Sequence, residues 1–126
     1  MTISDYLERI KERILFDPVV DEFHVIRERM TATDSYIRVK MSLDDGGMLE
    51  SAEYVQYNAE GEIELVTYSH YWANADSEIM KRWDNTPHFP DLPNFPNHVH
   101  DGKSGTVRSS VPMSIRVVLD EIARRK

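Results

Sequence analysis

The chain has 126 residues, contains no cysteine and carries a formal net charge of −7. This length fits one domain that can fold without a metal, and the lack of cysteine excludes disulfides, thiolate metal ligands and a cysteine nucleophile. The acidic balance argues against a general nucleic-acid binder, because such proteins neutralise phosphates with Lys and Arg.

The first predicted element is an amphipathic helix over residues 3–16. Its apolar residues recur at spacings of three and four and make one stripe: Ile3, Tyr6, Leu7, Ile10 and Ile14. Thr2 or Ser4 can cap it, and Asp17-Pro18 should end it. Charges run through the first twenty residues, so they are not a signal peptide, and no apolar run reaches the roughly 20 residues of a membrane span. We therefore expect a cytoplasmic protein without a membrane segment.

Four or five strands should follow. Residues 35–43 alternate most clearly, with Ile37, Val39, Met41 and Leu43 on one face and polar side chains on the other. The strands are expected at 19–30, 35–43, 48–57, 62–73 and 79–83. The turns between them are short, as at Asp44-Asp45-Gly46-Gly47, which implies an antiparallel meander.

A long loop and a final helix complete the prediction. Four prolines between residues 87 and 96 exclude a regular helix or a central strand there. A helix is expected near 112–125, with Ser110 as its cap and Pro112 in its first turn. The expected fold class is α+β: a single domain, 1–126, with an antiparallel meander of four to six strands flanked by an N-terminal and a C-terminal helix. The helices should cover one face of the sheet and leave the other partly open.

Charge is unevenly distributed along the chain. Residues 41–80 hold nine acidic residues and no Lys or Arg, while four of the five histidines lie between 70 and 100. Arg27 and Arg29 share a strand face, as do Arg38 and Lys40, so a hairpin could align four cations. Such a patch can contact phosphates, or simply keep an exposed strand soluble.

The segment from residue 68 to residue 100 resembles the TumE-like family of toxin components of prokaryotic toxin–antitoxin pairs. The resemblance rests on a series of short motifs in order: His70-Tyr71-Trp72, Asp76, Arg82-Trp83-Asp84-Asn85, Pro87-His88 and Phe95-Pro96-Asn97-His98-Val99-His100. The chain departs from the family pattern at Asn97, where a second histidine is common, which puts a direct role for that position in doubt.

The resemblance implies a toxin of a type II pair, encoded beside a DNA-binding antitoxin that would be its cognate partner. RNA is the usual guess for the target of such toxins, so a ribonuclease with histidine acid/base chemistry is the leading hypothesis. A non-catalytic module that binds protein or nucleic acid is the first alternative. The sequence leaves open whether the chain also forms a homo-oligomer.

The candidate catalytic residues are taken from the same segment: His70, Arg82, Asp84, His88, His98 and His100. If the hairpin turn centres near Asp76, His70 should lie opposite Arg82, and Tyr68 opposite Asp84. The structural alternatives are a buried Arg82–Asp84 ion pair and a turn-forming role for Asp84 with Asn85.

His98 and His100 share a face if their segment is extended. Two imidazoles near neutral pKa suit general acid–base catalysis, and an arginine suits developing phosphate charge. The same spacing suits a metal ion, so a metal-dependent hydrolase with His98, His100 and His88 as ligands is a further alternative. No organic cofactor is expected, because the chain lacks a phosphate-binding glycine loop.

Overall fold

The computed structural model describes residues 1–125 and consists of one seven-stranded sheet with two helices. The elements in chain order are α1 Ile3–Phe16, β1 Val20–Met30, β2 Asp34–Leu43, β3 Met48–Tyr57, β4 Ile63–Ala73, β5 Ile79–Asp84, β6 His98–Asp101, β7 Val107–Ser109 and α2 Ile115–Arg124. The strands follow chain order across the sheet, and each pairs antiparallel with the next. The predicted α+β meander is confirmed, with seven strands in place of four to six.

The helix α1 has the predicted bounds and a capping box. The Asp5 amide donates to the Thr2 hydroxyl, and the Thr2 amide donates to the Asp5 carboxylate, so two otherwise unsatisfied N–H groups gain partners. Ile3, Leu7 and Ile10 are buried against the sheet. Neither helix within residues 1–125 is long and apolar enough to cross a bilayer.

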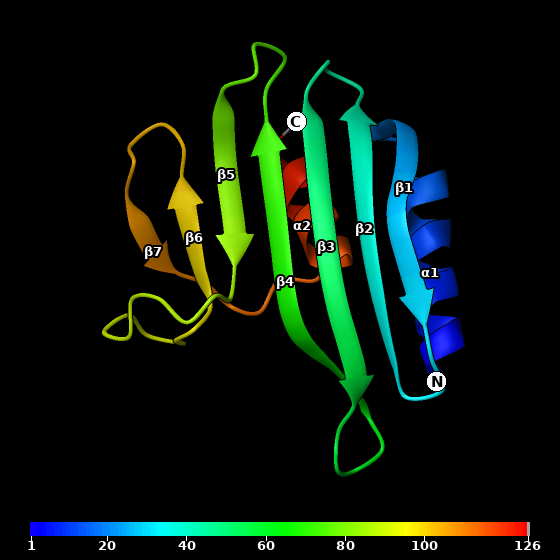
Figure 1. The fold of residues 1–126 in the computed structure, drawn as a ribbon. Coiled ribbons are helices and arrows are strands. Elements are labelled where there is room, and N and C mark those ends of the chain that lie inside the picture. The colour runs from blue at the N-terminus through cyan, green and yellow to red at the C-terminus, as the bar shows by residue number, and fades with distance from the viewer. Residues whose placement is uncertain (126) are drawn as a thin grey trace.

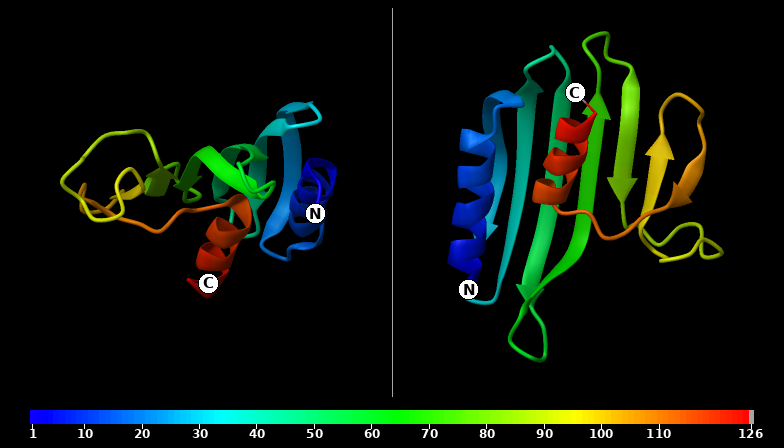
Figure 2. Two further views of the ribbon diagram at one scale, coloured as in Figure 1. Left: turned by 90° about the horizontal axis from the view of Figure 1, so that it is seen from below. Right: turned by 180° about the vertical axis from the view of Figure 1, so that it is seen from behind.

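Both helices lie on the same face of the sheet. Figure 1 looks at the uncovered face with α1 and α2 behind it, and the rear view in Figure 2 shows the helices in front. The core lies between the helices and the inward residues of the strands, such as Ile37, Val39 and Leu49, together with Leu119 and Ile122 of α2. The opposite face, called the open face below, carries the alternate residues of each strand.

The pairing of β4 with β5 differs from the predicted pairing by one residue. Ala73 faces Ile79, as a turn centred at Asp76 requires, but Trp72 faces Lys81 because a bulge adds one residue to β5. His70 therefore lies opposite Trp83, and Asp84 opposite Ser69. Since a one-residue slip reverses the face of every side chain, the predicted grouping of His70 with Arg82 is wrong.

Strands β6 and β7 arise in a segment predicted as loop. Residues 102–105 form the turn between them, and Gly102 packs so closely on β5 that a Cβ there would lie 1.8 Å from the Ile79 carbonyl oxygen. The final helix begins at Ile115 with Ser114 as its cap, so the predicted cap at Ser110 is wrong. Residues 110–114 are non-helical and lead into that cap.

One buried carboxylate joins α1, α2 and the sheet. Glu53 of β3 is 2% exposed, accepts a hydrogen bond from the Tyr6 hydroxyl of α1, and accepts a second from the Ile115 amide at the start of α2. The pKa of Glu53 is raised overall, because burial raises it by more than these two hydrogen bonds lower it. The contact satisfies an amide of the first turn of α2, where partial positive charge favours a carboxylate.

Candidate functional site

Four of the predicted site residues meet on the open face, where β5 pairs with β6. Asp84 faces His98 across the two strands, and Arg82 faces His100. Residues directly opposite in an antiparallel pair project to the same side, so the four side chains form one cluster. We call Arg82, Asp84, His98 and His100 the histidine cluster.

His98 is the most buried member, with an exposed fraction of 1%. Its Nδ1 lies 2.9 Å from the Pro96 carbonyl oxygen, which can only accept, so Nδ1 carries a proton. Nε2 then faces Asp84, 3.0 Å from Oδ1. That approach is poorly aligned for a hydrogen bond, and Nε2 has no hydrogen-bond partner within residues 1–125. A buried nitrogen beside a carboxylate in this way is suited to hold a proton or a metal ion.

His100 has a different environment. The Arg82 guanidinium lies 3.2 Å from its Nε2 and must donate, so that nitrogen offers a lone pair. Partial burial, then the charge of Arg82, then His98, hold the pKa of His100 below its ordinary value. His100 is consequently neutral at neutral pH and has the form required of a base. Arg82 remains 45% exposed in its side chain and lies 3.9 Å from Asp84, so the pair is not the buried ion pair considered above.

The proline-rich loop places an aromatic ring over the two histidines. The Phe89 ring centroid lies 5.2 Å from that of His98 and 5.9 Å from that of His100, in edge-on contacts. The His88 ring centroid lies 6.1 Å from that of Phe89, also in an edge-on contact, and His88 is exposed. The loop thus shields His98 from water while leaving His88 at the rim of the cluster.

Asp84, His98 and His100 also have the arrangement of a metal site. One ligand atom from each lies within 4.8 Å of the others. A carboxylate with two imidazoles suits zinc or a similar transition metal, and an imidazole whose second nitrogen donates to a carbonyl is the usual support for such a ligand. The group holds Asp84 with His98 and His100, and the third residue predicted with these histidines, His88, is not part of it.

His70 lies on the helix-covered face, away from the cluster. It is fully buried, with Nδ1 2.8 Å from the Ser51 hydroxyl and Nε2 2.7 Å from the Met113 carbonyl oxygen. Burial lowers the pKa of His70 to about 4. Both ring nitrogens are satisfied, so His70 ties β4 to the segment before α2.

The two asparagines of the motifs support the loop. Asn85 accepts from the Tyr68 amide and donates to the Val66 carbonyl, replacing strand pairing where β5 ends. Asn97 accepts from the Tyr68 hydroxyl, whose pKa is raised by burial to about 12. Asp84 also accepts from the Thr86 amide, which fits the predicted turn-forming role. The sequence predicts only a turn-forming role for Asn85 and puts a direct role for Asn97 in doubt, because their contacts with Tyr68 join residues 17 and 29 positions apart in the chain.

The predicted alignment of cations across β1 and β2 is present on the open face. Arg27 lies opposite Arg38, and Arg29 lies opposite Tyr36. Arg38 pairs with Glu50 of β3 at 2.6 Å, while Arg27, Arg29 and Lys40 are exposed. The basic residues therefore share the face that carries the histidine cluster.

Comparison with known proteins agrees with the resemblance noted in the sequence. A family model described as Toxin TumE matches residues 7–126, which is nearly the whole chain. No curated protein and no solved structure matches it. The match covers α1 from Leu7 onwards, the complete sheet and α2, as well as the motif segment. The chain belongs to the TumE toxin family.

Proposed function

We propose that this toxin is the toxic partner of a type II toxin–antitoxin pair and cleaves RNA with the histidine cluster. The observation that supports this most is the contact of the buried His98 Nε2 with Asp84, beside a His100 held neutral next to Arg82. One imidazole faces a carboxylate and the other faces a guanidinium, so the two histidines have the different surroundings that an acid and a base require.

The proposed reaction is attack of an RNA 2′-hydroxyl on the adjacent phosphorus. His100 takes the hydroxyl proton as the 2′-oxygen forms its bond to phosphorus. The bond from phosphorus to the 5′-oxygen breaks, and that oxygen takes the proton that His98 Nε2 holds against Asp84. Arg82, released from His100, stabilises the charge on the phosphate oxygens. The products are a 2′,3′-cyclic phosphate and a free 5′-hydroxyl, and Phe89 must move aside for the leaving oxygen to reach His98.

The second candidate function is metal-dependent hydrolysis at Asp84, His98 and His100. It is favoured by the grouping of their ligand atoms within 4.8 Å. A bound ion would supply a Lewis acid or an activated water. A chelator distinguishes metal-dependent hydrolysis from acid–base cleavage. It removes the ion from a metal site and so abolishes activity. An acid–base pair stays active with chelator present and keeps its bell-shaped pH profile.

Substitution of single cluster residues tests the proposal. We expect His100→Ala and His98→Gln each to lower RNA cleavage about 100-fold or more, the usual contribution of an acid or base, and to abolish growth arrest. His24→Ala is the matched control, because His24 is exposed on β1. Melting temperatures establish that the variants fold. Full toxicity of both cluster variants would contradict catalysis by the histidines and favour a module that acts by binding alone.

A further inference from the structure

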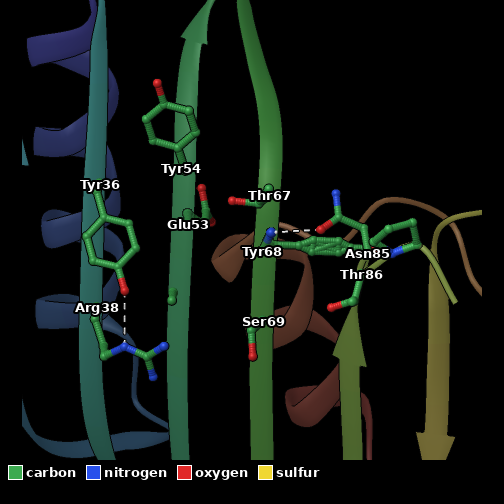
Figure 3. A pocket seen from close by; sticks show the side chains of 11 residues that line it. Tyr36, Arg38, Glu53, Tyr54, Thr67, Tyr68, Ser69, Asn85 and Thr86 are labelled. Atoms are coloured by element: carbon green, nitrogen blue, oxygen red, sulfur yellow. Dashed lines mark hydrogen bonds between the residues drawn. The ribbon is translucent and has the colours of Figure 1, made fainter.

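The open face carries a hollow of about 380 Å³ beside the histidine cluster. Figure 3 shows side chains from β2, β3 and β4 facing those from the start of the proline-rich loop. The small residues Ala52 and Ser69 form the floor of the hollow. One side is formed by Tyr36, Arg38 and Tyr54, and the other side by Asn85, Thr86 and Pro87. The hollow is thus open to solvent and bounded by aromatic, basic and hydroxyl groups.

Two tyrosines in this hollow are held in place. Tyr36 and Tyr54 lie directly opposite each other on β2 and β3. The Tyr54 hydroxyl donates to Asp34 at 2.7 Å, and the Tyr36 hydroxyl accepts from Arg38 Nε at 3.1 Å. Both rings are partly exposed and are seen face-on in Figure 3. Fixed rings that present their π-faces are platforms on which unpaired bases stack, whatever the base.

The charge beside the tyrosines suits a phosphate backbone. Exposed Arg27 and Arg29 border Arg38 and Tyr36 on the neighbouring strand. Glu50 pairs with Arg38 at 2.6 Å, and Asp34, which accepts from Tyr54, lies close enough to Arg29 to interact with its charge. Arg27 and Arg29 therefore place two exposed cations beside the tyrosines on a protein whose net charge is −7.

The hollow is aligned with the proposed site. A single row of paired residues crosses the open face: Arg27, Arg38, Ala52, Ser69, Asp84 and His98. Arg38 and Asp84 are three strands apart, or about 14 Å at the usual strand spacing. A strand of nucleic acid lying along this row would bring a phosphate to the histidine cluster when bases a few positions away rest on the tyrosines.

We infer that this hollow is a subsite for single-stranded RNA, in which bases stack on Tyr36 and Tyr54 and phosphates contact Arg27 and Arg29. The inference rests on the proposed RNA-cleaving function and names its substrate class. Single strands are favoured over duplex, because bases are exposed for stacking only when they are unpaired.

The test measures binding of a fluorescent ten-nucleotide RNA by anisotropy. The RNA carries 2′-O-methyl groups, which remove the nucleophile and prevent cleavage by the proposed route. We expect Tyr36→Ala and Tyr54→Ala each to weaken binding about tenfold or more, while Tyr36→Phe and Tyr54→Phe stay within about threefold. Phe16→Ala is the control for loss of an exposed aromatic, because Phe16 lies on α1 at 77% exposure.

Salt dependence tests the phosphate contacts separately. Replacing Arg27 and Arg29 by Ala should flatten the slope of log affinity against log salt by about 0.7 for each lost contact, whereas the tyrosine variants should leave that slope unchanged. The subsite would be overturned if duplex RNA bound as tightly as single-stranded RNA, or if both Tyr36→Ala and Tyr54→Ala left the affinity unchanged. Either result would overturn it even if His100→Ala abolishes cleavage. Tyrosine-dependent binding with full toxicity of the histidine variants would instead retain the subsite and remove the catalytic proposal.

Discussion

His70 and His98 are both buried, but their ring nitrogens meet different partners. Both nitrogens of His70 are hydrogen-bonded, to Ser51 and to the Met113 carbonyl. His98 uses Nδ1 in the same way, yet its Nε2 faces the carboxylate of Asp84. A satisfied buried imidazole stabilises one packing arrangement, whereas an incompletely satisfied one keeps the capacity to exchange a proton or bind an ion.

The burial of His70 predicts how stability depends on pH. Its pKa is about 4 when folded and ordinarily 6.5, so the unfolded chain binds the proton more tightly between these values. The stabilising contribution is complete above pH 6.5 and is lost as pH falls towards 4, by about 3 kcal/mol in all. Urea unfolding of the wild type and of His70→Gln, which cannot titrate, should show a flatter pH dependence for the variant over this window. Parallel curves for the two proteins would contradict this assignment.

The proline-rich loop and the end of β5 together create the histidine cluster. Residues 85–97 separate Asp84 from His98, and the loop returns the chain so that β6 pairs beside β5. Asn85 and Asn97 anchor its two ends through Tyr68 of β4. The loop is therefore a scaffold for the site as well as its cover.

Because Glu53 attaches α2 to the sheet, we expect its substitution to lower stability strongly. Glu53→Ala removes the acceptor of the Tyr6 hydroxyl and the Ile115 amide, leaving buried donors without partners, and should lower the free energy of unfolding by about 2–5 kcal/mol. Glu50→Ala is the control on the same strand, because its partly exposed pair with Arg38 is worth about 0–1 kcal/mol. Thermal and urea unfolding measure both. Equal losses in the two variants would show that the buried contact adds nothing to stability.

At the scale of the whole molecule, the two faces of the sheet have separate roles. The helices cover one face and form the core, so the open face is left to carry the cations, the hollow and the histidine cluster (Figure 1). The β3–β4 hairpin extends beyond the sheet and exposes Glu60, Glu62 and Glu64 at or near its turn. An acidic projection of this kind offers a contact for a basic partner.

We expect an antitoxin encoded by the neighbouring gene to bind this hairpin. Reversal of Glu60, Glu62 and Glu64 to Lys should weaken the complex about tenfold or more, and raised salt should weaken the wild-type complex. Reversal of Glu8, Glu12 and Asp21, which are exposed outside the acidic segment, is the control with the same change of charge. Titration calorimetry compares the affinities. Insensitivity to both salt and the hairpin reversals would place the antitoxin contact elsewhere.

Local patterns accounted for much of the fold. The apolar stripe of α1 and the alternation of β2 are periodic patterns of residues that are close in the sequence. Short turns between strands also require antiparallel neighbours. The prediction that His98 and His100 share a face also held, since β6 is extended. The short strands β6 and β7 were missed, because they are held mainly by pairing with one another and with β5.

The sequence by itself determined the α+β class, the order of the elements and the residue types available for chemistry, because helix and strand periods depend on near neighbours. Only the tertiary structure decided which side chains meet. One additional residue in β5 turned Arg82 and Asp84 to the face opposite His70 and left Asp84 beside His98. Likewise, Glu53 bonds to Tyr6 of α1, which is 47 positions away in the chain, and to Ile115 of α2, which is 62 positions away. Such choices depend on register and on packing between distant segments, where a shift of one residue exchanges the two faces of a strand.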